Sequence, residues 1–184
     1  SVEVGAEVFL NGMSLGEAVD TTLSIDHTLH EGHNVIVLEA MDTAGNMAMQ
    51  TLNVELDSYE PVLVVTGPAT DIVTNADAVM VTGMVELGAE LTVGGTQVVP
   101  SETGAFSHEF TLAAGENTIE LRATDTATNE ATVTVVVYQD QVPPSVDIQS
   151  PEDGFITDQG LVEVTVVADE DAMLWLNGRM LQDV

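Results

Sequence analysis

Apolar and polar residues alternate along most of the chain, which is the pattern of β-strands with one buried face. One face of such a run carries Leu23, Ile25, His27 and Leu29. The matching face of another run carries Phe106, His108, Phe110 and Leu112. No stretch has a clear period of 3.6 residues. The pattern predicts an all-β protein, with strands in the central part of the chain at 62–66, 78–83, 89–93, 96–99, 105–112, 117–124 and 131–138.

Turn-forming residues separate these runs. Asn-Gly pairs stand at Asn11-Gly12 and Asn177-Gly178, and the sequence DTAGN runs from Asp42 to Asn46. Such residues tolerate the positive φ angles of tight hairpins. About seven short strands with turns every 8 to 12 residues are typical of an immunoglobulin-like sandwich.

The strand pattern recurs along the chain as an 83-residue repeat. Residues 1–61 align with residues 84–144 without a gap, and 23 of these 61 positions are identical. We call this separation, from position 1 to position 84, the repeat offset. The segment AMLWLNG, Ala172 to Gly178, has the same phase as AEVFLNG, Ala6 to Gly12.

The position of each segment within the 83-residue repeat divides the chain into three parts. We predict the C-terminal part of one Ig-like repeat at 1–61, a complete repeat at 62–144 and the N-terminal part of a third at 145–184. Short linkers containing proline lie between them, at DSYEP and DQVPP.

The incomplete outer repeats have two interpretations. Residues 145–184 supply first strands of the kind that residues 1–61 lack, so the tail of one chain could complete the head of the next. That arrangement duplicates some strands, because the two parts together are longer than one repeat. A longer continuous chain, of which these residues are a part, is the simpler interpretation.

Three sequence segments resemble a known family: Val81 to Gly95, Gly104 to Phe106, and Leu112 to Asn129. They resemble the Ig-like surface repeats of bacteria and archaea, close to the module called glucodextranase-like domain B. The resemblance implies a role as a spacer, stalk, lattice block or adhesive array, or as an accessory module beside a secreted glycosidase. Thr128 departs from the pattern, where the family usually has glycine and Gly45 retains it. We expect the hairpin to close nevertheless, because Asn129 tolerates a left-handed conformation.

The chain is strongly acidic: two arginines and no lysine stand against 31 Asp and Glu residues, which gives a formal net charge of −29. Such a surface repels phosphate backbones and anionic lipids, which makes both poor partners, and we expect neither nucleic-acid binding nor direct membrane insertion. Self-repulsion of this size favours a saline or cation-rich habitat, although an ordinary acidic secreted protein remains the alternative. Cysteine is absent, so no disulfide framework exists. No apolar run is long enough to span a membrane, and targeting segments could lie outside these residues.

Some acidic residues are candidate calcium ligands, because calcium binds carboxylate and amide oxygens. Asp42 and Asp125, each followed four residues later by asparagine, could bind calcium, but holding a tight turn is the more common role of such residues. The linker acids could instead bind calcium between domain ends or simply be solvated. These linker residues are Asp57, Glu60, Asp140 and Asp147.

Two other groups of residues have possible binding roles. His27, His30 and His33 suggest zinc, but a spacing of three along a strand sends neighbours to opposite faces, which argues against a shared ion. Phe9 and Trp175 share an outward phase, where the middle repeat has Thr92. An exposed aromatic ring can stack on a sugar or fill a protein interface.

The sequence contains no phosphate-binding loop, nucleophile elbow or zinc-protease motif, so we expect no enzyme activity. It predicts a structural segment of an extracellular surface layer, stalk or filament, of archaeal or bacterial origin, that acts through association with neighbouring repeats or identical subunits. The alternative is a glycan-binding or accessory module of an adhesin or a secreted polysaccharide-degrading enzyme, in contact with cell-surface glycans.

Overall fold

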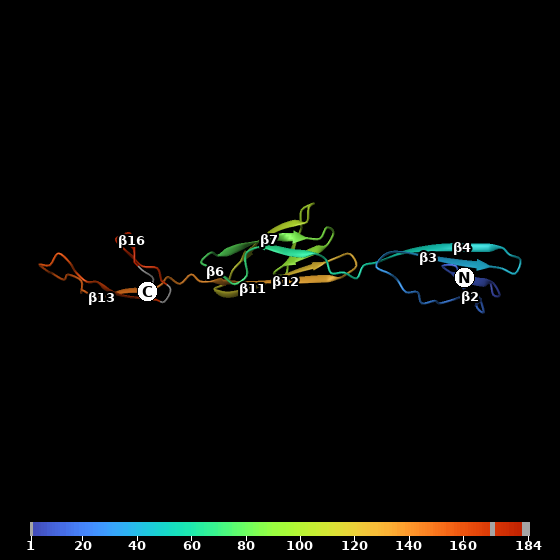
Figure 1. Ribbon diagram of the computed structural model, residues 1–184, viewed down its shortest axis with the longest axis horizontal. Coiled ribbons are helices and arrows are strands. Elements are labelled where there is room, and N and C mark those ends of the chain that lie inside the picture. The colour runs from blue at the N-terminus through green and yellow to red at the C-terminus, as the bar shows by residue number, and fades with distance from the viewer. Residues whose placement is uncertain (1, 170–171, 182–184) are drawn as a thin grey trace.

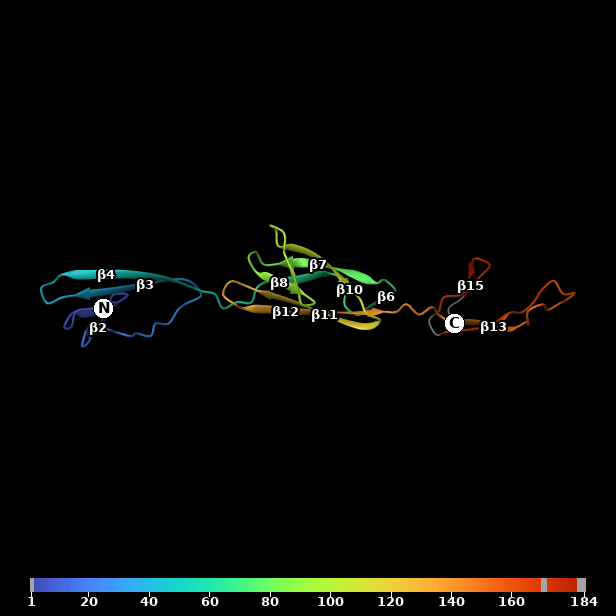
Figure 2. The same cartoon turned by 180° about the vertical axis from the view of Figure 1, so that it is seen from behind.

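The computed structural model describes residues 2–169 and 172–181, and its regular elements are all β-strands. Three groups of strands follow one another along the long axis of the molecule, with residues 2–56 at one end and residues 146–181 at the other (Figure 1). The reverse view shows the same order (Figure 2). Residues 170–171 and 182–184 of the predicted third repeat lie outside the described residues.

The middle group is a sandwich of two sheets, which confirms the predicted Ig-like class. One sheet has the order β10-β7-β5 and the other the order β6-β12-β11-β8-β9. The strands are β5 (Leu63–Gly67), β6 (Ile72–Thr74), β7 (Ala78–Val85), β8 (Glu90–Val93), β9 (Thr96–Val98), β10 (Ala105–Thr111), β11 (Gly115–Thr124) and β12 (Glu130–Gln139).

Alternation along these strands produces the core between the two sheets. Every second residue of β11 is fully buried, at Ile119, Leu121 and Ala123, while the residues between them face water. Phe106 and Val81 from the opposite sheet pack against them in one cluster. The seven predicted strands each overlap an observed strand.

The structure adds an eighth strand, β6, that the pattern did not predict. It pairs in parallel with β12, with Ile72 opposite Val137 and Thr74 opposite Gln139. The chain therefore enters the sandwich in one sheet at β5 and moves to the edge of the other sheet at β6.

The first group is a single sheet in the order β2-β1-β3-β4. Its strands β1, β3 and β4 lie one repeat offset before β8, β11 and β12, with the same bounds in each case. The group therefore has one of the two sheets of the sandwich. The strands are β1 (Glu7–Leu10), β2 (Met13–Glu17), β3 (Gly32–Met41) and β4 (Met47–Leu56).

The last group consists of two hairpins. In the first, β13 (Val146–Ser150) pairs with β14 (Thr165–Ala168), and in the second β15 (Trp175–Leu176) pairs with β16 (Arg179–Met180). β13 lies one repeat offset after β5 with the same bounds, and β14 falls within the counterpart of β7. This group therefore supplies strands of the sheet that the first group lacks.

Candidate functional site

The first sheet exposes on one face the residue positions that form the core of the middle repeat. Leu121 is fully buried, whereas its counterpart Leu38 is 40% exposed. Val135 is 3% exposed, whereas its counterpart Leu52 is 58% exposed. The difference arises because the sheet β10-β7-β5 covers the middle repeat, and no strand of the described residues covers the first. We call this surface of β1, β3 and β4 the open face.

The open face forms two neighbouring hollows. One, of about 450 Å³, lies between the sheet residues Leu10, Ile36, Leu38 and Leu52 and the segment that carries Leu23, Ile25 and His27. The other, of about 470 Å³, extends past Val8 and Ala40 to the turn at Asp42. Aliphatic side chains form most of the smaller hollow, whereas the larger one also contains polar and charged residues, among them Glu3, Glu39 and Asp42. The aliphatic part of the open face is suited to bury apolar side chains.

The segment 22–30 forms no strand in the described structure, which corrects the interpretation of Leu23 to Leu29 as one. Its counterpart β10 exists because it pairs along its whole length with β7, with Phe106 opposite Gly83 and Phe110 opposite Val79. By the repeat offset, only the last two positions of a counterpart of β7 fall in this sequence, at 1–2. The alternation is present, but no strand of the described residues pairs with this segment.

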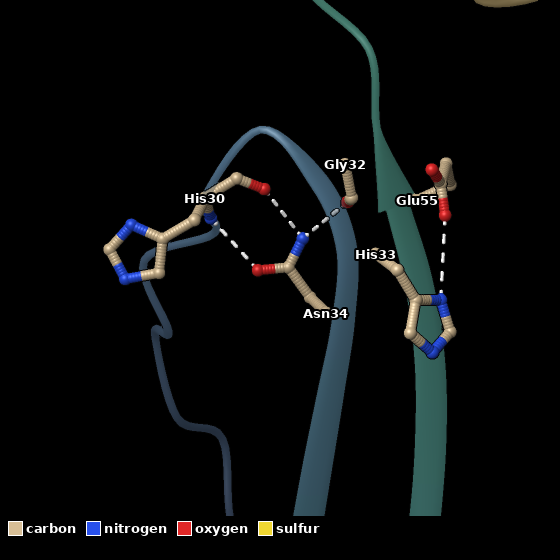
Figure 3. A network of polar contacts seen from close by, with 5 residues as sticks. All are labelled: His30, Gly32, His33, Asn34 and Glu55. Carbon is tan, nitrogen blue, oxygen red and sulfur yellow. Dashed lines mark hydrogen bonds and ion pairs between the residues drawn. The ribbon is translucent and has the colours of Figure 1, made fainter.

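A buried asparagine fixes the loop that precedes each long hairpin. The Asn34 side-chain amide donates to the carbonyl oxygens of His30 (2.6 Å) and Gly32 (2.8 Å), and its Oδ1 accepts the His30 N–H at 2.8 Å (Figure 3). Asn117 makes the same three bonds to Ala113 and Gly115. These bonds satisfy backbone groups that the loop leaves without strand partners.

Asp42 and Asp125 hold the tight turns of the two long hairpins. Asp42 Oδ1 accepts the N–H groups of Ala44 (2.9 Å) and Asn46 (2.8 Å), and Oδ2 accepts from the Asn46 side chain at 2.7 Å. Asp125 bonds Asn129 in the same way. The asparagine side-chain amide holds the pKa of each carboxyl below its ordinary value of 3.8, with the backbone N–H groups adding to the effect.

The turn geometry differs from expectation at Thr128. This β-branched residue itself adopts a positive φ, 73°, in the place of Gly45 at 86°. The hairpin therefore closes because Thr128, and not Asn129, accepts the left-handed conformation. The expected closure of the hairpin is confirmed, but the residue with the positive φ is Thr128 and not Asn129.

The four linker acids do not gather around one point. Asp57 Oδ1 accepts the Tyr59 N–H at 3.2 Å, Asp140 Oδ1 accepts the Val142 N–H at 2.9 Å, and the Asp147 carboxylate accepts from the side chain of Gln149. Glu60 is exposed. Among residues 2–169 and 172–181, no three His, Asp or Glu side chains lie close enough to hold a metal ion. A calcium role for these residues, and for Asp42 and Asp125, stays a prediction.

The histidines also have separate environments. His33 Nδ1 lies 3.4 Å from Glu55 Oε2 across the β3–β4 pair, and the ring of His30 points away from them (Figure 3). His27 Nε2 lies 3.5 Å from Asn11 Nδ2. No two of these rings share a partner in the described residues, so the trio has no zinc-binding geometry.

The two candidate aromatic residues differ in exposure. Trp175 in β15 is 56% exposed, whereas Phe9 in β1 is half-buried. They occupy equivalent positions of two repeats. Because their exposure differs, the two repeats do not present the same aromatic surface to a ligand.

The structure reveals a clamp on the first linker that the sequence did not indicate. From the first repeat, Glu31 accepts the Ser58 N–H at 3.0 Å and the Ser58 hydroxyl at 2.7 Å. From the middle repeat, the Asn129 side chain donates to the Asp57 carbonyl at 3.1 Å. Asn129 and Asp57 are far apart in the sequence, and only the fold brings the turn of one repeat to the linker that precedes it.

A two-sheet sandwich of this topology defines the middle repeat as an immunoglobulin-like module. Residues 61–141 match the model of the family described as glucodextranase, domain B, a range that overlaps the predicted complete repeat at 62–144. No curated protein matches the chain.

Several solved structures resemble this one at low sequence identity. The fibronectin(III)-like modules of Clostridium thermocellum CbhA are 14% identical over 76% of this chain and 80% of theirs, with a TM-score of 0.43. The protocadherin gamma-B4 extracellular domain is 14% identical over 91% of this chain and 30% of its own, with a TM-score of 0.38. A Bacteroides ovatus glucan-utilization protein, SGBP-B, solved with a mixed-linkage heptasaccharide, is 17% identical over 72% of this chain and 36% of its own, with a TM-score of 0.22.

The described residues contain no helix of the length and apolar character needed to cross a membrane.

Proposed function

We propose that this chain is a structural segment of an extracellular array of Ig-like repeats, such as a surface layer, stalk or filament, on a bacterial or archaeal cell. Its repeats act as mechanical building blocks that associate with neighbouring repeats, without enzyme activity. The observation that carries the proposal is the clamped linker between two repeats. Three strands of the first repeat, β1, β3 and β4, recur in the second with identical bounds at the repeat offset.

A clamp of this kind restricts the angle between consecutive repeats. A linker of a few residues bends freely only if its backbone groups remain bonded to water. Here Ser58 is bonded to the repeat before it and Asp57 to the repeat after it. Bending at this junction therefore breaks hydrogen bonds of about 0.5–1.5 kcal/mol each.

Small-angle X-ray scattering of Asn129→Ala tests the clamp. We expect a smaller radius of gyration than in the wild type at a dilution where both are monomeric, because the freed linker samples bent conformations. Asn46→Ala is the matched control, since the Asn46 side chain makes the same bond within its own turn to Asp42. Equal scattering of the two variants would contradict the mechanical role of the linker.

Glycan binding is the second candidate function, favoured by the exposed ring of Trp175. Under this alternative the chain is an accessory module of an adhesin or a polysaccharide-degrading enzyme. Binding on a glycan array that disappears in Trp175→Ala would support it. Binding that survives in this variant, or absence of binding by the wild type, would contradict it.

A further inference from the structure

The outer surface of the sheet β10-β7-β5 carries little charge, although the chain as a whole is strongly acidic. Its side chains alternate with those that pack in the core of the complete middle repeat. Of the outward residues of these three strands, all of which the structure describes, Glu109 alone is charged. We call the surface formed by these outward residues the low-charge face.

The outer surface of the opposite sheet is acidic, like most of the chain. Outward positions on β8, β11 and β12 carry Glu90, Glu116, Glu120 and Glu130. Arg122 lies among them and pairs with Glu130. The two outer surfaces of one sandwich therefore differ in charge, so overall composition does not explain the low-charge face.

Apolar side chains are exposed on the low-charge face. Val64, Met80 and Met84 are exposed at 50%, 49% and 50%, and Val64 lies opposite Met84 in the pairing of β5 with β7. Next to them, the hydroxyl oxygens of Thr66 and Thr82 lie 3.1 Å apart and bond each other. A hydroxyl that already has a partner is buried at lower cost than one that depends on water. The surface is therefore suited to contact with another protein.

The third repeat has acidic residues at two of the same sequence positions. By the repeat offset, Val64 corresponds to Asp147 and Met80 to Glu163. The repeat therefore accepts carboxylates at these positions, and the sandwich itself does not require valine and methionine there. Exposed apolar residues gathered on one surface are typical of an interaction site.

We propose that the low-charge face is a lateral interface at which two copies of this chain meet face to face. Two molecules of net charge −29 repel each other wherever their acidic surfaces approach. At the low-charge face they can touch without bringing carboxylates together. The inference goes beyond the proposed function, because it names a partner beside the array rather than along it.

The charge distribution favours a second copy over a basic partner. A basic protein would be attracted to the acidic surfaces, such as the outer side of β11 and β12, and not to the surface with the fewest carboxylates. The partner of the low-charge face must itself be apolar and nearly uncharged at the contact. The same surface of a second copy has both properties.

A two-fold axis that crosses β7 at Thr82 keeps the carboxylates of two copies apart. It places Met84 of one copy against Met80 of the other. By the register of β10 with β7, it also places Glu109 against Ala105. The two Glu109 residues are then separated by four residues along the strand, about 13 Å, which exceeds the screening length of about 10 Å at 0.1 M salt.

An axis that runs along β7 is disfavoured by Glu86. This residue directly follows β7, and its carboxylate is held at the end of the face by the Val62 N–H at 3.1 Å. An axis along β7 would bring Glu86 of one copy against Glu86 of the other, which like charges oppose. The crossing axis places Glu86 opposite Ala78 instead. The two copies therefore run antiparallel.

The contact is small, so we expect it to be weak between two isolated chains. Strands of 5 to 8 residues, three side by side, cover roughly 20 by 14 Å. A standard interface covers about 800 Å² on each partner. Cross-linking at high protein concentration is therefore a suitable test.

Single cysteines test the arrangement, because the chain has none of its own. Thr82→Cys should give covalent dimers of the 19.4 kDa chain with a short bis-maleimide in about 1 M salt, where charge repulsion is screened. Met84→Cys should give few, since the crossing axis separates the two copies of this residue. Thr118→Cys, on the outer side of β11, is the control and should also give few. Equal yields from Thr82→Cys and Thr118→Cys, or the highest yield from Met84→Cys, would overturn the proposal.

Sedimentation equilibrium measures the association without a cross-linker. The mean mass of the wild type should rise with concentration in about 1 M salt. Val64→Asp with Met80→Glu, which introduces the residues of the third repeat, should weaken this association by roughly tenfold or more, because it places like charges in the contact.

Thr118→Asp with Thr134→Glu is the matched control. It adds the same two charges to exposed positions of the opposite sheet and should leave the association close to that of the wild type. Equal weakening in the two variants, or a mass of 19.4 kDa for the wild type at all concentrations, would overturn the proposal. Neither result would affect the clamped linker, which small-angle scattering tests separately.

Discussion

At the scale of single residues, Thr128 is the clearest point of backbone strain. A β-branched side chain at φ 73° meets the following carbonyl group, at a cost of roughly 1–2 kcal/mol. Glycine adopts this conformation without the clash, as Gly45 does in the first repeat.

Thr128→Gly should therefore raise the free energy of unfolding of the middle repeat by about 1 kcal/mol. Gly45→Thr should lower the stability of the first hairpin by a similar amount. Hydrogen exchange of β11 and β12 against β3 and β4 in the full chain measures both effects. Slower exchange in β11 and β12 of Thr128→Gly is expected, and faster exchange would contradict the argument.

The carboxyl of Asp125 makes the turn sensitive to acid. Because the folded state holds its pKa below 3.8, this group contributes stability above the pKa of the unfolded chain. The contribution is lost as the pH falls through the lower, folded pKa. The wild type should thus lose stability below pH 3.8 by more than Asp125→Asn does.

Denaturant unfolding at several pH values, compared between the two proteins, isolates this effect from the general change in net charge. Asp26→Asn, at an exposed residue with no side-chain bond of this kind, is the control and should follow the wild type. Parallel curves for the wild type and Asp125→Asn would contradict the role of the turn.

At the scale of elements, the same strand has different surroundings in two repeats. Leu121 on β11 lies between two sheets, so Leu121→Ala should cost about 2–5 kcal/mol. Leu38 on β3 is already 40% exposed, so Leu38→Ala in dilute, monomeric protein should cost much less. Equal losses of stability in the two variants would mean that the open face is covered in solution.

Most strands could be predicted because the side-chain period reports which residues face inward. The period does not indicate which strand a segment pairs with. The segment 22–30 has the same alternation as β10, but β10 is a strand because it is hydrogen-bonded to β7. β6 could not be predicted, because so short a strand shows no visible period and its partner β12 comes much later in the chain.

The candidate site was predictable only in part. Residues 1–61 align with the later strands of the 83-residue repeat, so a first group with one sheet, and an exposed inner face on it, could be expected in outline. The clamp by Asn129 and Glu31 could not, since neither residue carries a local signal of a contact with Asp57 or Ser58. Carboxylates are so frequent in this chain that their presence in a linker does not indicate a shared ligand.

At the scale of the whole molecule, the net charge of −29 opposes compactness. The melting temperature should rise between about 0.1 and 1 M NaCl, as the screening length falls from about 10 Å to about 3 Å. Circular dichroism measures this directly. A melting temperature that does not change with salt would contradict the screening argument.

Calcium chloride at the same ionic strength separates screening from specific binding. A further rise that is removed by Asp57→Asn with Asp140→Asn would support calcium at the linkers. Coincident curves in the two salts would contradict that hypothesis.

The parallel pair of β6 and β12 determines how the middle repeat responds to tension. The first linker leads into β5, which pairs with β7, and the second linker leaves at the end of β12. Once β5 has left β7, a pull on both linkers drives β6 and β12 in opposite directions along their length. Their hydrogen bonds, together with that from the Asp140 N–H to the Thr74 carbonyl at 2.9 Å, are then loaded in shear and must fail together rather than one after another. Under the proposed mechanical role, this pairing predicts that the middle repeat resists extension until these bonds break as a group.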